Sequence, residues 1–86
     1  MIDVVYKTMF LRQYRKLPEA LQWEVKEKIE LFRNNPRNPS LRTHKLGGTL
    51  KGCLSFSVNY EYRIVFYVES KQRVALLAVG DHSVYE

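Results

Sequence analysis

The sequence has little of what small secreted or metal-binding domains depend on. Its 86 residues include one cysteine, Cys53, which excludes an internal disulfide framework and a cysteine-cluster metal site. No apolar run approaches the ~18–20 residues of a membrane-spanning helix. The stretch from Met1 to Tyr6 lacks the basic and apolar regions of a signal peptide. These absences predict a cytoplasmic protein with no membrane partner and no metal centre.

Acidic residues are also few relative to basic ones. Fourteen Lys and Arg against nine Asp and Glu leave a net charge of +5. This balance favours a polyanionic partner, either nucleic acid or an acidic protein, although solubility alone is the alternative. The length indicates one domain, and a hydrophobic fraction of 45% argues against disorder.

A β-hairpin is predicted near the middle of the chain. Leu54, Phe56 and Val58 alternate with serines, as in a half-buried strand, and a second strand rich in β-branched and aromatic residues follows a turn at 59–61. The apolar run that comes last should be a central strand. The predicted strands are 2–6, 53–58, 62–68 and 73–79.

Two helices are predicted before the hairpin, at about 8–17 and 18–34. Thr8 is a candidate N-cap, Pro18 fits the first position of the second helix, and Glu24 with Lys28 is a favourable i, i+4 pair. Their apolar stripes predict a short-linked antiparallel hairpin with these core residues: Phe10, Tyr14, Leu17, Leu21, Val25, Ile29 and Phe32.

The order β-α-α-β-β-β predicts an α+β fold. An N-terminal strand and the helical hairpin should pack on one face of a mainly antiparallel four-stranded sheet. The glycine-rich segment 41–52 is predicted to be a loop or an edge. The other face should be free, with Ser55, Ser57 and Arg63 pointing to it.

His82 and Arg63 are the first candidates for chemistry. Histidine is suited to proton transfer near neutral pH, and His82 follows the last strand directly, although an exposed tail histidine is an equal alternative. Arg63 is the one charge in an apolar strand. Its planar guanidinium suits a phosphate, and the alternative is an ion pair with Glu61 or Asp81.

Other side chains could bind RNA or a metal ion. Tyr60, Tyr62, Tyr67 and Tyr85 offer faces for base stacking, although strand aromatics more often serve packing. A basic loop could follow an RNA backbone or simply be solvated; it contains Arg42, His44, Lys45 and Lys51. The two histidines with Asp81 or Glu61 are a weak alternative metal site. No G-x-S-x-G turn surrounds the serines, which excludes that hydrolase site.

Several motifs, taken in order, resemble those of a known family. The chain resembles the RelE/ParE toxin superfamily of bacterial type II toxin–antitoxin modules, and within it the RelE and YafQ-like mRNA interferases. The resemblance covers essentially all of 1–86 as a single toxin domain, and the order and spacing of the motifs make it specific. The motifs are Lys16-Leu17-Pro18, Asn35-Pro36, His44-Lys45-Leu46-Gly47-Gly48, Leu50-Lys51-Gly52, Tyr62-Arg63-Ile64-Val65-Phe66, Val79-Gly80-Asp81-His82 and Val84-Tyr85.

The resemblance implies a toxin that cuts mRNA in the ribosomal A site without a metal or other cofactor. Its implied partners are mRNA, the ribosome and a cognate antitoxin, with which it forms a hetero-oligomer. The ribose 2′-OH attacks the adjacent phosphate; by analogy His82 protonates the leaving 5′ oxygen, Arg63 holds the phosphate and Tyr85 orients or stacks a base. His44 and Glu61 match YafQ-like groups that assist proton transfer. The implied RNA-binding residues are Arg42, Lys45, Lys51, Ser55, Ser57 and Tyr62.

Two positions depart from the family pattern. RelE has lysines near Ser55 and Ser57, and YafQ has a histidine near Ser57. Serine cannot act as a base at neutral pH without an activating neighbour, so the site is either YafQ-like or weakened. Two other functions therefore stay open: a ParE-like inhibitor of DNA gyrase without nuclease activity, and an inactive binding module.

Overall fold

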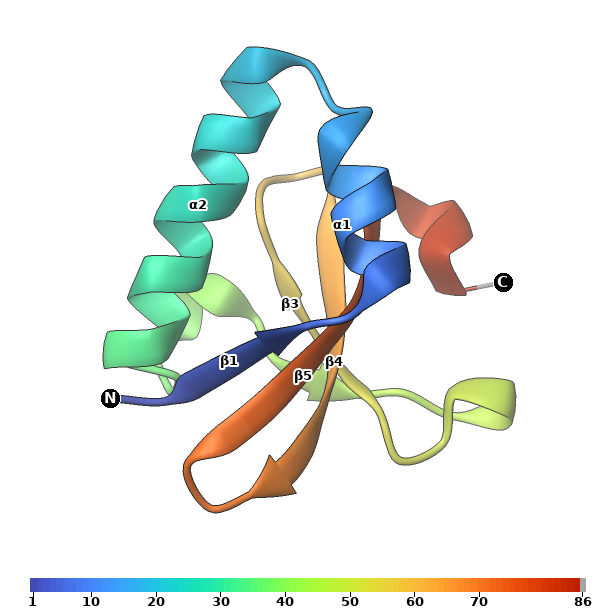
Figure 1. The fold of residues 1–86 in the computed structure, drawn as a ribbon. Helices are drawn as coiled ribbons and strands as arrows, with labels where there is room; N and C mark the ends of the chain where they lie inside the picture. Colours follow the sequence, from blue (N-terminus) through green and yellow to red (C-terminus); the bar gives the residue numbers. More distant parts are fainter. Residues whose placement is uncertain (86) are drawn as a thin grey trace.

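The structure is a computed structural model that describes residues 1–85, the side chains of Ser83 and Tyr85 excepted. The chain forms two α-helices, five strands and three short 3₁₀ helices in the described part (Figure 1). In order they are β1 (Asp3–Tyr6), α1 (Thr8–Arg15), α2 (Glu19–Asn34), η1 (Pro39–Leu41), β2 (His44–Lys45), η2 (Gly48–Leu50), β3 (Leu54–Ser57), β4 (Arg63–Ser70), β5 (Arg73–Gly80) and η3 (His82–Tyr85).

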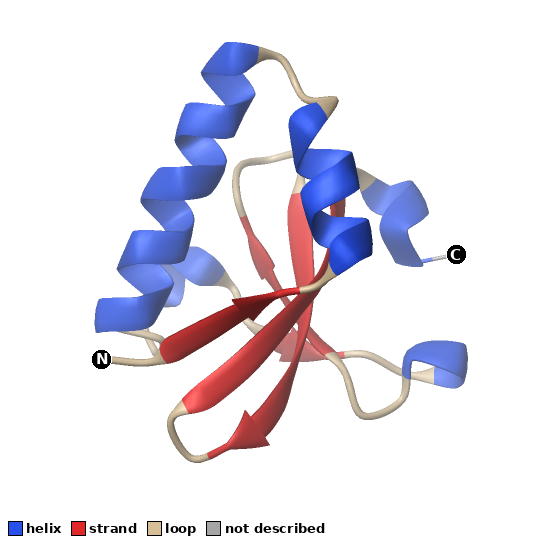
Figure 2. Ribbon diagram, viewed as in Figure 1, coloured by secondary structure: helices blue, strands red, loops and turns tan. Residues whose placement is uncertain are grey.

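One mixed sheet carries all the strands, in the order β1-β5-β4-β3-β2. β1 runs parallel to β5 and the other pairs are antiparallel, while α1 and α2 form a hairpin over one face (Figure 2). The predicted α+β class and central last strand are confirmed. The predicted count of four strands is wrong, because His44 and Lys45 pair with Ser55 and Leu54 as a fifth strand. A two-residue strand is too short to show alternation.

The helix ends differ slightly from the predicted ones. Thr8 is not the N-cap; Lys7 occupies that position without a side-chain cap, and Pro18 is the N-cap of α2 rather than its first residue. α1 ends at Arg15 instead of residue 17. Leu17 precedes a proline, and the proline ring disfavours helical backbone in the residue before it. The chain therefore leaves the helix early and turns tightly into α2.

The core lies between the helical hairpin and the sheet. The predicted stripe of α2 is buried, and Phe10 of α1 is buried beside it. Phe32 stacks on Phe56 of β3 with ring centroids 4.6 Å apart and meets Phe66 of β4 edge-on at 4.9 Å. Such aromatic pairs add to the free energy of simple area burial. This trio holds α2 over β3 and β4, the two strands that carry Ser57 and Arg63.

The second face of the sheet is not free, contrary to the prediction. Ser55 is 0% exposed and Ser57 7% exposed, and Val65, which pairs with Ser55, is buried as well. The 3₁₀ helix η1 contacts β3, and η3 contacts both β4 and β5. The short 3₁₀ helices could not be predicted as covering elements because three or four residues show no periodicity. Within residues 1–85, no helix is long and apolar enough to cross a bilayer.

Candidate functional site

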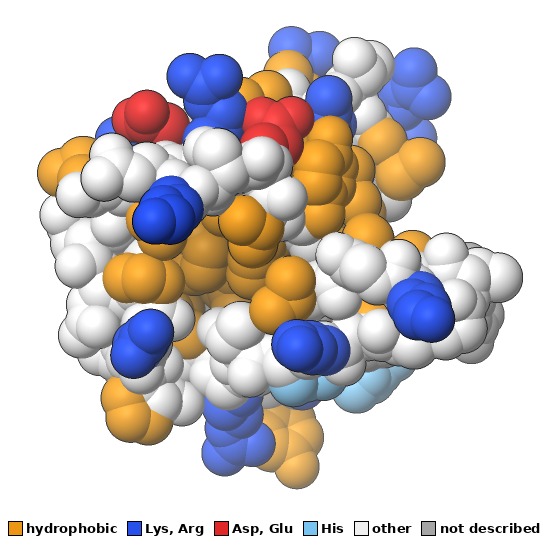
Figure 3. All heavy atoms as spheres, turned by 90° about the horizontal axis from the view of Figure 1, so that it is seen from below, with side chains coloured by type: hydrophobic (Ala, Val, Ile, Leu, Met, Phe, Trp, Pro, Cys, Tyr) orange, Lys and Arg blue, Asp and Glu red, His pale blue; other side chains and the backbone are white. Residues whose placement is uncertain are grey.

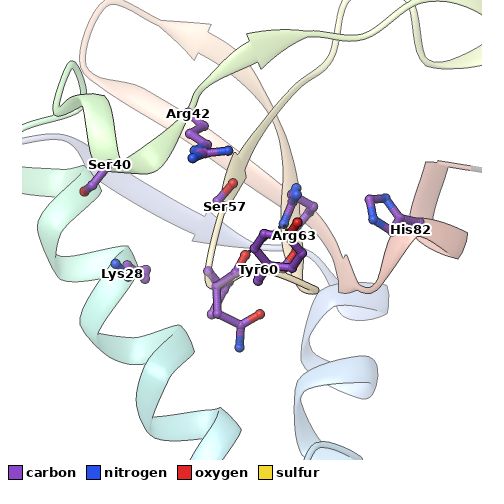
Figure 4. A pocket seen from close by; sticks show the side chains of 9 residues that line it. Lys28, Ser40, Arg42, Ser57, Tyr60, Arg63 and His82 are labelled. Atoms are coloured by element: carbon purple, nitrogen blue, oxygen red, sulfur yellow. Dashed lines mark hydrogen bonds between the residues drawn. The ribbon is translucent and has the colours of Figure 1, made fainter.

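A cavity of about 370 Å³ opens beside the β3–β4 turn (Figure 4). Its walls come from α2, η1, the end of β3, the turn, the start of β4 and the start of η3. None of the described residues that line it is acidic. The lining residues are Lys28, Ser40, Arg42, Ser57, Val58, Asn59, Tyr60, Arg63 and His82. The cavity therefore brings together five of the residues that the sequence analysis nominated: Arg42, Ser57, Tyr60, Arg63 and His82.

Strand register places Arg63 in the middle of this site. Arg63 lies opposite Ser57 of β3 on one side and Gly80 of β5 on the other. Side chains directly opposite each other in an antiparallel pair are close neighbours, so Ser57 and Arg63 share one patch of the sheet. Gly80 adds no side chain there, and Val84 of η3 packs against it, 3.5 Å from where a Cβ atom would lie.

The Arg63 guanidinium is held by backbone oxygens. Nη1 donates hydrogen bonds to the carbonyls of Asn59 at 2.9 Å, Tyr62 at 3.1 Å and Tyr60 at 3.3 Å. The ion pair recorded among the described residues joins Arg33 and Glu30, and the recorded partners of Arg63 are these carbonyls, which favours anion binding over a structural ion pair. Neutral carbonyls orient the group without cancelling its charge. Arg63 can therefore still attract an anion.

Asn59 organises the turn that supplies those carbonyls. Its Oδ1 accepts hydrogen bonds from the backbone N–H groups of Glu61 and Tyr62, both at 2.9 Å. Its Nδ2 donates to Glu24 Oε2 on α2 at 3.1 Å. The predicted Glu24–Lys28 pair is wrong, because the ion pair found among the described residues is Arg33–Glu30. Glu24 thus braces the turn, and Lys28 lines the cavity.

His82 approaches from the opposite side. It is the first residue of η3 and follows Gly80, the partner of Arg63, by two positions. Figure 4 shows Arg63 and Tyr60 between His82 and Lys28. His82 is exposed and lines the cavity, which favours the functional interpretation over that of a detached tail.

The remaining predicted residues lie outside the cavity lining. His44 of β2 pairs with Ser55 of β3, which is two residues before Ser57 in the same strand. The Nδ1 atom of His44 lies 3.1 Å from the carbonyl oxygen of Arg42. Tyr62 is half-buried against the core cluster. Tyr60 is instead 91% exposed at the cavity and is better placed for base stacking. Also outside the lining are Lys45, Lys51, Ser55 and Glu61, and the side chain of Tyr85 lies outside the described residues.

The sequence analysis did not nominate four of the lining residues as site residues: Lys28, Ser40, Val58 and Asn59. Lys28 had the spacing of a helix ion pair, and Ser40 and Asn59 fell in turns. The Asn59-Tyr60-Glu61 turn carried a usable signal, since asparagine side chains often bind backbone amides two residues on. No local signal could place Lys28 beside η1.

The surface seen from below in the orientation of Figure 1 carries many positively charged side chains. Figure 3 shows Lys and Arg side chains around a hollow where hydrophobic side chains gather, with acidic groups only along one edge. In residues 1–85 there is no group of three or more His, Cys, Asp or Glu that could hold a metal ion. The surface is suited to a polyanion with apolar faces, such as single-stranded nucleic acid.

Comparison with known proteins identifies the fold. No family model and no characterised sequence matches the chain, but solved structures do. A copper-bound mutant toxin from Helicobacter pylori is 21% identical over 100% of both chains, with a TM-score of 0.74. YafQ from E. coli strain BL21(DE3) is 16% identical over 98% of this chain and 97% of its own, with a TM-score of 0.79.

The chain has the RelE-like toxin fold. YoeB, in its heterotetrameric complex with YefM from Staphylococcus aureus, is similar too: it is 16% identical over 95% of this chain and 98% of its own, with a TM-score of 0.73. The RelE-like fold is the one that the sequence motifs predicted. At these identities the similarity establishes the fold, and the site must be argued from its own residues.

Proposed function

We propose that this chain is the toxin of a type II toxin–antitoxin pair and that it cleaves mRNA in the ribosomal A site. The observation that carries the proposal is the convergence of Arg63 and His82 on one cavity whose described lining has no acidic residue. The RelE-like fold, shared with YafQ and with YoeB in complex with YefM, supports it. A cognate antitoxin is accordingly the proposed protein partner, in a hetero-oligomer that forms in the cytoplasm.

The proposed reaction is a transfer of the phosphoryl group within the RNA. The 2′ oxygen attacks the adjacent phosphorus as its proton passes to solvent with the help of His44 and Glu61, the bond from phosphorus to the 5′ oxygen breaks, and the 5′ oxygen takes a proton from His82. The products are a 2′,3′-cyclic phosphate and a 5′-hydroxyl. Each step moves charge onto phosphate oxygens or the leaving oxygen, where oriented donors lower the barrier.

Arg63 and His82 take the central roles in this reaction. The Arg63 guanidinium, already oriented by three backbone carbonyls, stabilises the charge on the non-bridging oxygens. His82, across the cavity, protonates the leaving 5′ oxygen. Ser57 offers a hydroxyl donor where RelE has a lysine, and Tyr60 a ring for an unstacked base. His44 and Glu61 assist proton transfer from the margin, and Tyr85 orients a base.

Primer extension on a reporter mRNA in a translating extract tests the proposal. Wild-type protein should produce cuts at codon-related positions that require ribosomes. His82→Ala should reduce the cleavage rate by about 10²–10⁴-fold, the usual contribution of a general acid. Arg63→Lys should also slow cleavage, because an ammonium cannot reproduce the fork of a guanidinium.

Arg73→Lys is the matched control for the arginine variant. Arg73 is exposed at the start of β5, at the end of that strand away from Gly80, and the variant should cleave as the wild type does. Intact mRNA with the wild-type protein would overturn the nuclease proposal. An assay of DNA supercoiling by gyrase would then distinguish a gyrase inhibitor from an inactive binding module.

A further inference from the structure

Lys28 places a positive charge in the cavity that the proposed cleavage chemistry does not use. It extends from α2, is half-buried, and lines the cavity on the side away from His82 (Figure 4). Glu24, one helical turn earlier, bonds to Asn59 instead, and no described carboxylate forms an ion pair with Lys28. A partly desolvated ammonium without a counter-charge is stabilised by an anion.

Arg42 adds a second cation to the lining of the cavity. It is the C-cap of η1 and has a φ of +50°, in the left-handed region that is costly for a long side chain. It also is exposed and forms no ion pair with the described carboxylates. Local strain of this kind is often retained at functional sites because it positions a group. Ser40, which also lines the cavity, already donates its hydroxyl to Asn38 Oδ1.

The cavity therefore has positively charged side chains on separate walls. Lys28 lies on the α2 side and Arg63 on the β4 side, Arg42 reaches in from η1 beside Ser57, and His82 lies beyond Arg63 on η3 (Figure 4). At about 370 Å³ the cavity is at the small end of ligand sites, the size for part of a chain rather than a large ligand. Successive phosphates of one strand repeat the same charge at short intervals, and positive side chains on separate walls of one cavity suit more than one phosphate.

We propose that Lys28 and Arg42 form a second phosphate subsite, which binds the phosphate next to the one held by Arg63. The inference rests on the proposed function and narrows its substrate to single-stranded RNA with at least two successive phosphates. It assigns these residues to binding and not to the chemical step.

Two non-cleavable RNAs test the subsite. One is a dinucleotide with a single phosphate and the other a trinucleotide with two, each with 2′-deoxyribose at the position of attack. Binding is measured by NMR titration with wild-type protein and with Lys28→Met and Arg42→Gly. The methionine keeps the apolar stem of lysine, and glycine accepts the positive φ of position 42 without strain.

Each variant should weaken trinucleotide binding about tenfold, as expected for a charge-assisted hydrogen bond. Each should also reduce the slope of log affinity against log salt by about 0.7, the value for one phosphate contact on a single strand. Dinucleotide binding should not change. Lys26→Met is the matched control, because Lys26 is on the same helix but lines the α1–α2 groove and should behave as wild type.

Several results would overturn the subsite. These are wild-type binding to neither RNA, equal losses with dinucleotide and trinucleotide, or the same loss in Lys26→Met. Competition by a hexaglutamate peptide that depends on Lys28 would reassign it to an acidic protein. Arg63→Ala separates the two proposals: if it abolishes binding of both RNAs while Lys28→Met changes nothing, only the second subsite fails.

Discussion

Asn59 shows how the hydrogen bonds of one side chain can prepare a site. Its oxygen closes the β3–β4 turn and its amide nitrogen reaches Glu24 on α2. The carbonyl oxygens of the same turn accept hydrogen bonds from Arg63. The position of the guanidinium therefore depends on a contact between residues 35 positions apart in the chain.

A double substitution tests this bracing contact. Asn59→Asp keeps the oxygen acceptor of the turn but faces Glu24 with a second carboxylate, so it should lower the free energy of unfolding by about 1 kcal/mol. Glu24→Gln added to it restores a donor and should recover most of that loss. Urea denaturation of the four proteins measures the coupling. Additive losses, with no recovery in the double variant, would mean that the contact does not stabilise the turn.

At the scale of elements, α1 holds the part of β5 that β1 does not reach. β1 pairs with β5 only from Arg73 to Leu76, so the edge of β5 beyond Leu76 has no strand beside it. There the backbone N–H of Val79 donates to Gln13 Oε1 of α1 at 2.9 Å. This bond satisfies a buried donor just before the segment that leads to His82.

Replacing Gln13 tests that support. Gln13→Ala leaves the Val79 amide unpaired and should lower the free energy of unfolding by about 1–3 kcal/mol. Because β5 leads into η3, mRNA cleavage should fall as well. Gln13→Glu keeps an acceptor at the same place and should retain more of both. Amide exchange at Val79 measured by NMR gives the local readout, and equal protection in wild type and Gln13→Ala would contradict the argument.

The aromatic trio gives a second element-scale prediction. Phe32→Ala removes the ring that stacks on Phe56 and meets Phe66, and should cost about 3–5 kcal/mol of unfolding free energy. Trp23→Ala is the control on the same helix, since Trp23 is 59% exposed and its ring lies under the Lys26 ammonium at 5.0 Å. Thermal denaturation should show a large loss for Phe32→Ala and a small one for Trp23→Ala; similar losses would place the main anchor of α2 elsewhere.

At the scale of the whole molecule, charge and size act together. The net charge of +5 on 86 residues favours fast association with acidic partners. A domain of this length buries only about 60–65% of its unfolded surface, so its stability is modest and a tight partner should raise it. Both properties suit a protein that is kept bound to a proposed antitoxin.

Association with a co-expressed antitoxin should depend on salt. The association rate constant, measured by stopped flow, should fall at least tenfold between low salt and about 0.5 M salt, while the dissociation rate changes less. Lys and Arg side chains surround the hollow in Figure 3, so this face should contribute to the steering. A rate that does not respond to salt would show that the net charge has no part in the encounter.

Much of the fold could be predicted because it follows from local patterns. The stripe Leu21, Val25, Ile29 and Phe32 repeats at helical spacing, and the core buries all of it. The run 74–79 is apolar throughout, as expected of a strand between two others. The strand β2 and the covering 3₁₀ helices have too few residues for any periodicity, so they could not be predicted.

The sequence by itself determined the α+β class, the helical hairpin, the basic charge, and the choice of Arg63 and His82 as candidates for chemistry. Only the tertiary structure decided which charges meet. Pairing of Glu24 with Asn59 rather than Lys28, and the approach of η1 to α2, depend on packing between segments distant in the chain. Residue types and local spacing specify elements, whereas a site is specified by contacts whose partners no local pattern names.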